Sequence, residues 1–289
     1  MVMSAFTRRT AVVALAVATL AVPSIASAQT PEPTLPPPAP ETTPAQPGGF
    51  SVTWETLNRA NRAVGRDLRR SKAIERVVSA VNDLIVVNRA IPIYFTDETE
   101  IGPAYLPDQN GQKLGVIVFP GWFLKLENDA LRRQLRGVKG LGPKRALQYA
   151  NQFVVAHEIG HALVDQLKLP VTGKEEDAVD GFAAYLLTSD KRFGPLVPLS
   201  AAMLFDAIKH DDGKLGDSDF ADEHSLPQQR VYQFLCWIYG SDTKRFKGIV
   251  GKDMLPRARA RRCADEYRQL RSSWDQLLQP HLKEAPDAS

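Results

Sequence analysis

The spacing of apolar residues separates helical stretches of the chain from one short β-rich region. Apolar side chains recur every three or four positions over residues 54–68 and 74–84, and again over most of the chain after Leu124. Between these stretches, runs of β-branched and aromatic residues predict strands at 92–95, 102–106 and 114–119. Pro103 cannot donate a hydrogen bond to a sheet, so its strand belongs at an edge. The pattern predicts a mainly helical α+β fold with a small antiparallel sheet.

The first 28 residues contain the three parts of an export signal. Arg8 and Arg9 precede an apolar run at 11–22, and Ala26-Ser27-Ala28 forms a cleavage site. Because the apolar run is too short to span a bilayer, we expect a signal peptide that is removed. The mature chain would be exported to the periplasm or secreted, without stable membrane insertion. A retained anchor is the alternative, and the arginine pair also fits the twin-arginine export route.

A linker and one domain are expected after the signal. Prolines and small polar residues dominate 29–49 and leave little apolar surface to bury. The domain should cover 50–289, with N-terminal helices and the sheet at 50–143 and a helical metal-binding part at 144–289. The net charge is only +3, and two of these charges, Arg8 and Arg9, lie in the predicted signal. The mature chain therefore lacks the basic excess that is typical of proteins that bind nucleic acid.

Cys236 and Cys263 are the only two cysteines of the chain. Export would place both in an oxidising compartment, where a structural disulfide is the default expectation. We therefore predict that they pair with each other. Two buried free thiols are the alternative.

The motif that carries chemistry is His157-Glu158-Ile159-Gly160-His161. Two histidines four positions apart on a helix lie on the same face, so both imidazoles can reach one metal ion. Glu158 then lies beside the open position of the metal and can take a proton from bound water. Apolar neighbours predict a largely buried helix at 144–168, where unpaired polar groups would be costly. Two buried histidines and a salt-bridged glutamate are the alternative without a metal.

A catalytic zinc site normally needs a third protein ligand. Leu167 stands where the metzincin pattern requires a histidine, so that pattern is excluded. After a helix break, Glu176 and Asp180 lie four positions apart on the next predicted helix. Glu176 could bind the metal while Asp180 accepts the N–H of a ligand histidine. Glu175 is the alternative third ligand, and an acidic cluster that only complements the helix N-terminus is the alternative without a metal.

The order of these residues resembles the pattern of the gluzincin metallopeptidases, in which a metal-binding helix is followed by a glutamate with an aspartate four residues later. A second motif lies further along the chain, where Arg230 follows His224 by six positions. This pair is similar to the histidine and arginine of peptidases related to the membrane-bound CAAX-processing enzymes. Residues 151–239 more closely resemble a bacterial family of putative metallopeptidases of unknown function.

The family resemblance implies a zincin-like fold of the gluzincin type. The HExxH helix would pack against the small sheet, and an edge strand would receive an extended substrate. The family's site residues fall here on His157, Glu158, His161 and Glu176, with His224 and Arg230 added by the second motif.

Roles for His224 and Arg230 follow from their place at a helix start. His224 precedes a predicted helix at 227–239 and could donate a hydrogen bond to the oxyanion that develops during hydrolysis. Arg230 could orient a carboxylate or the same oxyanion. A surface pair at the start of a helix is the alternative for both residues.

The sequence therefore predicts an exported zinc metallopeptidase that hydrolyses peptide bonds with metal-activated water and Glu158 as general base. Its partner would be a peptide or protein substrate, and its oligomeric state does not follow from the sequence. Zn²⁺ is the expected metal, although two histidines and one carboxylate also suit iron. Two other functions stay open, a catalytically silent zinc-binding or assembly protein and a zinc amidase acting on cell-wall cross-links. Glu158 argues against a purely structural site, which needs no base.

Overall fold

The described part of the chain begins just before the predicted domain. The computed structural model describes residues 48–137, 140–193, 196–208, 215–251 and 254–284. The predicted signal peptide and all but the end of the predicted linker lie outside these residues. No helix within the described ranges has both the length and the apolar character needed to cross a membrane.

Four strands and nine α-helices are described within these ranges, together with two short 3₁₀ helices. The strands are β1 (Gly49–Trp54), β2 (Ala90–Thr96), β3 (Ala104–Leu106) and β4 (Val116–Pro120). The helices are α1 (Arg62–Ser71), α2 (Ala73–Leu84), α3 (Gly121–Gln134), α4 (Pro143–Leu167), α5 (Glu175–Ser189), α6 (Leu196–Ile208), α7 (Asp217–Ala221), α8 (Pro227–Ser241) and α9 (Arg257–Leu278). The 3₁₀ helices are η1 (Lys247–Ile249) and η2 (Gln279–His281).

The four strands form one sheet in the order β1-β2-β4-β3, which confirms the predicted α+β fold and corrects one detail of it. The sheet is mixed, because β1 pairs with β2 and β2 with β4 in parallel, while only β3 and β4 are antiparallel. A parallel pair needs a long crossover, and α1 and α2 supply it between β1 and β2. The strand that contains residues 104–106 lies at an edge, as Pro103 predicted.

Residues 49–54 form a strand that the sequence did not predict, and its last residue is the one at which the predicted helical stretch began. The three-residue spacing of Trp54 and Leu57 does not reflect a helix, because Trp54 is the last residue of β1. Its ring stacks on that of Phe95, with 3.8 Å between the ring centroids. Helix α1 begins only at Arg62. The prediction for 74–84 is confirmed, since α2 covers these residues.

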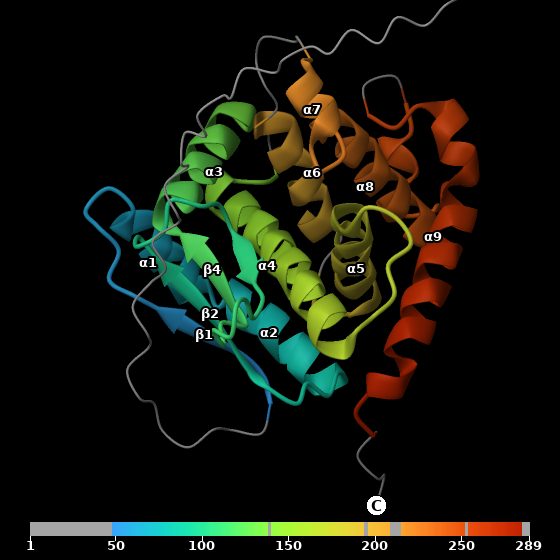
Figure 1. Cartoon of the computed structure of the whole chain (residues 1–289). Coiled ribbons are helices and arrows are strands. Elements are labelled where there is room, and N and C mark those ends of the chain that lie inside the picture. Colours follow the sequence, from blue (N-terminus) through green and yellow to red (C-terminus); the bar gives the residue numbers. More distant parts are fainter. Residues whose placement is uncertain (1–47, 138–139, 194–195, 209–214, 252–253, 285–289) are drawn as a thin grey trace, which may run out of the picture. The chain divides into compact units, whose positions relative to one another are not determined.

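Helix α4 lies at the centre of the described part of the chain and is buried on nearly all sides along its middle turns. It packs against α2, α3, α5 and α6 and also contacts β3 and β4. Figure 1 shows it running between the sheet and the helices α5 and α6. Gly142 and Pro143 begin the helix, and Lys168 ends it in a left-handed conformation. The predicted helix at 144–168 is thus confirmed.

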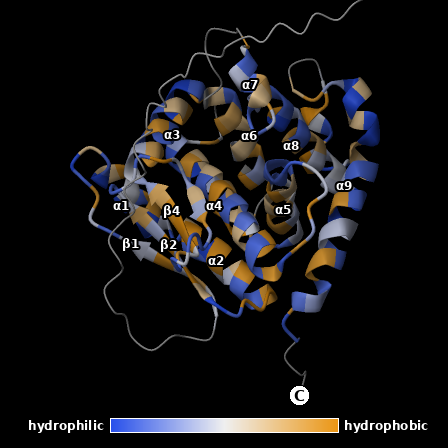
Figure 2. Cartoon of the chain, viewed as in Figure 1, coloured by the Kyte–Doolittle hydropathy of each residue, from blue (hydrophilic) through white to orange (hydrophobic). Residues whose placement is uncertain are grey.

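Hydrophobic residues follow the strands and α2, whereas the visible side of α9 is mostly hydrophilic (Figure 2). Helix α9 packs along α8, and the disulfide between Cys236 and Cys263 joins the two helices, which confirms the predicted pairing. Closing a loop of this size, with the cysteines 27 positions apart, stabilises a fold by about 3 kcal/mol in the chain-entropy description. The bridge therefore fixes α8, which carries part of the site described next.

Candidate metal centre

A glycine allows the two helices of the site to approach each other closely. Gly160 lies in the middle of α4 and faces α5, where a Cβ atom in its place would be 2.8 Å from the Cβ of Val179 and 3.2 Å from the ring of Phe182. Carbon atoms of neighbouring side chains normally stay about 3.5 Å apart or more. Only glycine at this position permits the observed spacing, which brings the first turn of α5 to the histidines of α4.

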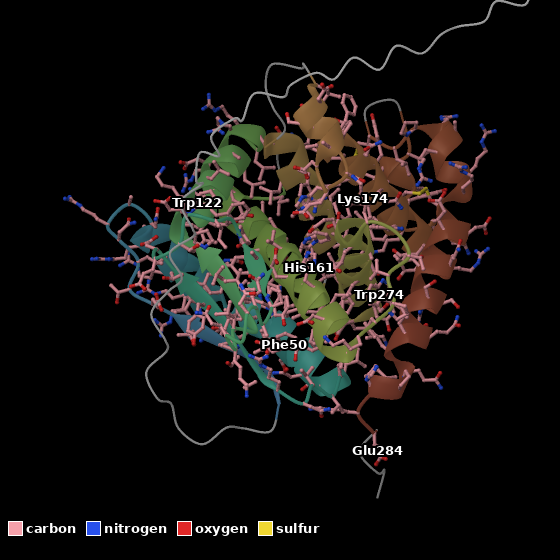
Figure 3. The ribbon with its side chains drawn as sticks, viewed as in Figure 1. Phe50, Trp122, His161, Lys174, Trp274 and Glu284 are labelled. Atoms are coloured by element: carbon pink, nitrogen blue, oxygen red, sulfur yellow. A yellow bond between two sulfur atoms is a disulfide. The ribbon has the colours of Figure 1, made fainter. Side chains whose placement is uncertain are left out.

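Glu176 on α5 points at both histidines of the HExxH motif. Its Oε2 atom lies 3.0 Å from His157 Nε2, and its Oε1 atom lies 3.2 Å from His161 Nε2. His161 is labelled near the middle of the view in Figure 3, beside α4. The structure thus brings together the three residues that the sequence predicted as metal ligands.

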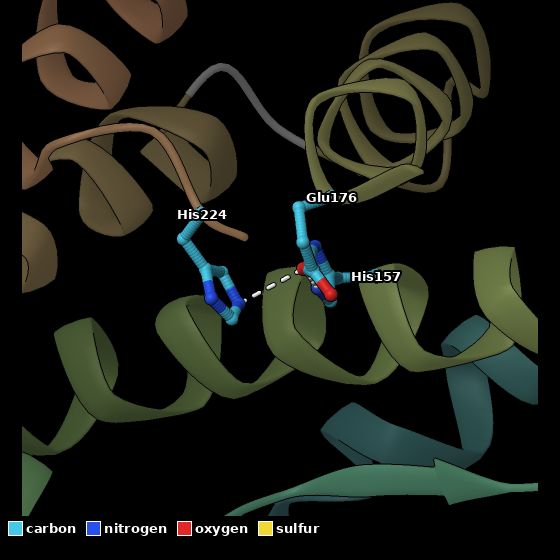
Figure 4. Close-up of side chains that lie close together, drawn as sticks. All are labelled: His157, Glu176 and His224. Carbon is cyan, nitrogen blue, oxygen red and sulfur yellow. Dashed lines mark ion pairs between the residues drawn. The ribbon is translucent and has the colours of Figure 1, made fainter. Parts of the chain in front are cut away.

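His224, from the segment before α8, reaches the same carboxylate. Its Nε2 atom lies 2.9 Å from Glu176 Oε2, and Figure 4 shows its ring and that of His157 beside this carboxylate. Within the described ranges, His157, Glu176 and His224 form a group that could hold a metal ion, with one ligand atom from each lying within 4.8 Å of the others. The structure therefore places His224 beside the candidate ligands, where the sequence predicted an oxyanion donor.

Each of the three histidines has a carboxylate at its other ring nitrogen. The Nδ1 atoms lie 2.8, 2.8 and 3.0 Å from a carboxylate oxygen. The pairs are His157 with Asp180, His161 with Glu175, and His224 with Asp222. A carboxylate acceptor favours the ring proton on Nδ1 and leaves a lone pair on Nε2, as in histidines that bind metals. Asp180 contacts His157 as the sequence predicted, whereas the partner role of Glu175 was not foreseen.

The donor set fits a bound cation better than it fits a hydrogen-bond network. Glu176 Oε2 is buried and lacks a hydrogen-bond partner within the described structure, although the Nε2 atoms of His157 and His224 lie only 2.9 to 3.0 Å away. Three Nε2 lone pairs and a carboxylate that face one another repel unless positive charge lies between them. Imidazole nitrogens and a carboxylate oxygen are also the ligands that zinc prefers. The residues present can therefore hold a metal ion.

The pKa values of His157 and Glu176 also indicate that the site favours positive charge. Burial would lower the pKa of His157, but the carboxylates of Asp180 and Glu176 raise it to about 10. Burial would raise the pKa of Glu176, yet the close approach of the His157, His161 and His224 rings holds it far below its usual range. A group of histidines that attracts protons this strongly also attracts a divalent cation, which replaces the protons on binding.

Glu158 is buried beside the histidines and is oriented by the sheet. The backbone N–H of Tyr105, in the edge strand β3, donates a hydrogen bond of 2.9 Å to Glu158 Oε2. Burial raises the pKa of the Glu158 carboxyl, and the neighbouring His157 and His161 partly offset this rise. A carboxylate with a raised pKa next to a metal position is suited to accept a proton and to return it. The contact with Tyr105 joins strand to helix, and nothing in the local sequence signals it.

Arg230 contacts the site through Asp180. It donates two hydrogen bonds of 2.8 Å, from Nε and from Nη2, to the two oxygens of that carboxylate. Its guanidinium also lies 3.9 Å from the centre of the Phe205 ring on α6. Of the two roles that the sequence left open for Arg230, the structure shows the orientation of a carboxylate. Arg230 therefore positions Asp180, which in turn holds His157.

Two cavities meet at His157, Glu158 and His224. A cavity of about 470 Å³ is lined by β3 residues, by the HExxH residues and by carboxylates that include Asp165, Glu175 and Glu223. A smaller cavity of about 190 Å³ has mainly apolar walls and also touches His157 and Glu158. A third cavity, of about 590 Å³, lies along α9, but no histidine lines it and it has no contact with the metal centre. Of these three cavities, the first two contact the candidate metal centre and can hold a substrate beside it.

Comparison with known proteins identifies one relationship. The family model DUF4344, described as "Putative metallopeptidase", matches residues 55–278 of the chain. No curated protein and no solved structure matches the chain. The matched range contains all the residues of the candidate metal centre, and the description agrees with the chemistry that their arrangement allows.

Proposed function

The chain belongs to this metallopeptidase family, and on that premise we propose that it hydrolyses peptide bonds with a zinc ion held by His157, His161 and Glu176. A zinc ion in this position polarises the scissile carbonyl and lowers the pKa of a bound water. The observation that carries the proposal is the convergence of His157 Nε2 and His161 Nε2 on the two oxygens of one partly buried carboxylate, next to a buried Glu158.

Glu158 acts as general base in this proposal. It takes the proton of the attacking water and returns it to the leaving amine. The N–H of Tyr105 fixes one of its oxygens, so that the other oxygen can face the water. Asp180 keeps the Nε2 lone pair of His157 directed at the metal, and Arg230 holds Asp180 in place. A silent zinc protein would have no need of a buried base at this position.

The surroundings of the centre suit a peptide substrate. Strand β3 lies at the edge of the sheet and lines the larger cavity, and an edge strand can bind an extended peptide through main-chain hydrogen bonds. The smaller cavity has room for one apolar side chain, and its walls include Phe123, Phe153 and Phe205. We propose that the residue of the substrate next to the scissile bond places an apolar side chain there.

We also propose that the protein works after export. The disulfide between Cys236 and Cys263 supports this, because such bridges persist in oxidising compartments. The N-terminal 28 residues would act as the export signal, and the mature chain would lie in the periplasm or the medium.

Replacing Glu158 with glutamine tests the proposal. Glu158→Gln keeps the size of the side chain and leaves the proposed ligands in place, so the variant should bind zinc like the wild type and lose hydrolysis by at least about 100-fold. His161→Ala should lose both zinc binding and hydrolysis. The measurements are zinc content and digestion of a peptide library with and without chelator. Glu98→Gln, an exposed change after β2, is the matched control. Full peptidase activity of Glu158→Gln would refute the role of the base.

A further inference from the structure

His224 approaches the metal position in the same way as the histidines of α4. Its Nε2 atom and that of His157 face the same oxygen of Glu176, at 2.9 and 3.0 Å. The two rings are nearly parallel, with 13° between their planes and 6.4 Å between their centroids. Figure 4 shows the Glu176 carboxylate beside both rings. A cation at this oxygen would have both imidazole nitrogens within reach.

Hydrogen bonds join the segment that carries His224 to the start of α5. The Asp222 carboxylate accepts hydrogen bonds from the His224 backbone N–H, at 2.7 Å, and at the ring Nδ1, at 3.0 Å. Lys174 donates to the carbonyls of Asp222 and His224 at 2.9 and 3.2 Å, and Ser225 donates to Asp177 at 2.9 Å. These contacts fix the backbone of the segment and place the ring beside Glu176. With a proton on Nδ1, a neutral His224 presents a lone pair at Nε2, which suits a metal and not an oxyanion.

We propose that His224 is a third histidine ligand of the metal in the resting protein and closes the position that the attacking water needs. This inference rests on the proposed function, because it concerns the same ion. Three histidines and one glutamate would give the four protein ligands that are typical of closed zinc sites, whereas hydrolysis requires an open position. His224 must therefore leave the metal before hydrolysis can begin.

His224 is the ligand that can leave most easily. Its side chain is 41% exposed, compared with 6% for His157 and 15% for His161. It lies in a connection and not in a helix, so its departure does not unwind any helical turn. It also lines both cavities of the site, the larger one beside β3 and the smaller apolar one. A substrate that occupies both cavities has to displace this side chain and thereby opens the metal.

X-ray absorption spectroscopy of the zinc-loaded wild-type protein tests the proposal directly, because it counts the imidazoles bound to the metal. The proposal expects three imidazoles without substrate and two with a bound substrate analogue. Two imidazoles in the resting protein would overturn it. This measurement needs no variant and is independent of the folding of any mutant.

The zinc affinity of variants provides a second test. In competition with a chelator, His224→Ala should bind zinc at least about 100-fold more weakly than the wild type, since even the loss of a ligand's hydrogen-bond partner costs 10- to 100-fold. His281→Ala, a change in η2, is the matched control and should not alter the affinity. Unchanged affinity in His224→Ala would overturn the proposal. If His161→Ala also keeps wild-type affinity, the proposed function itself is wrong, so the two failures can be told apart.

Discussion

The spacing of α4 and α5 can be tested by replacing Gly160 with alanine. The added Cβ would lie 2.8 Å from Val179 Cβ and 3.0 Å from its Cγ1. Because Cβ is fixed to the backbone of α5, no rotation of the valine side chain removes this contact. Restoring a separation of about 3.5 Å requires the two helices to move apart by roughly 0.7 Å.

Two effects oppose each other in the stability of Gly160→Ala. Overpacking a buried contact costs about 1–3 kcal/mol, whereas alanine is better than glycine inside a helix by about 1 kcal/mol. The free energy of unfolding should therefore fall by about 0–2 kcal/mol. The effect on the metal should be clearer, because a metal–ligand distance tolerates changes of only about 0.2 Å. Glu176 moves with α5, so we expect the zinc affinity to fall at least about tenfold, or about 1.4 kcal/mol.

Urea unfolding of the zinc-free protein measures the packing cost, and chelator competition measures the zinc affinity. Gly173→Ala is the matched control, because it lies in the connection between α4 and α5 and a Cβ there meets no atom within 4 Å. It should leave both quantities unchanged. The reasoning would be refuted if Gly160→Ala were more stable than the wild type by the full helix-propensity gain and bound zinc equally well.

Two further changes test buried carboxyl groups. Glu127 is fully buried, with Asn151 as its one hydrogen-bond donor among the described residues, and burial raises its pKa from 4.5 to about 8. The stability linked to this group is therefore fully present below pH 4.5 and is lost as the pH rises through 8, by about 1.4 kcal/mol per pH unit in between. Urea unfolding at pH 5 and pH 8 should show this loss in the wild type and not in Glu127→Gln; equal losses would contradict the assignment. Asp180→Asn removes the charge at His157 Nδ1 and should weaken zinc binding by about 10- to 100-fold in calorimetric titration, whereas the exposed control Asp265→Asn on α9 should have little effect.

The helices of the site could be predicted because their signals are local. Four-residue spacing places His157 with His161, and Glu176 with Asp180, on one face of a helix whatever the rest of the fold does. The boundaries of α4 and α5 also carry local signals, in Pro143 at the first turn of α4 and in the acidic first turn of α5. Burial of α4 followed from the apolar residues on all its sides.

The strand directions could not be predicted in the same way. The pattern of a strand states which residues are buried, but its direction depends on the connection that precedes it. The 35 positions between Trp54 and the start of β2 contain α1 and α2, and this long crossover makes the first pair parallel. Strand β1 was missed because its last apolar residue also fits a helical spacing with Leu57.

The partners of the site residues were missed for a different reason. Tyr105 lies 53 positions before Glu158, and the carboxylate of Asp222 belongs to a loop far along the chain from α4. Such contacts depend on how β3 and the connection before α8 pack against α4, which no spacing within one segment reveals. Glu175 contacts His161 from the same turn that supplies Glu176, so its competition with Glu176 could be recognised from the sequence, although its partner could not.

The metal centre combines a rigid part with an accessible part. His157, Asp180 and Arg230 form a buried chain of contacts, and Arg230 also rests on Phe205 of α6. Helix α8, which carries Arg230, is joined to α9 by the disulfide at Cys236. In contrast, the partners of His161 and His224 are half-exposed carboxylates. Removing one member of a buried ion pair costs several kcal/mol of folding stability. The His157 side of the centre should therefore keep its geometry, while the His224 side can adjust when a substrate enters.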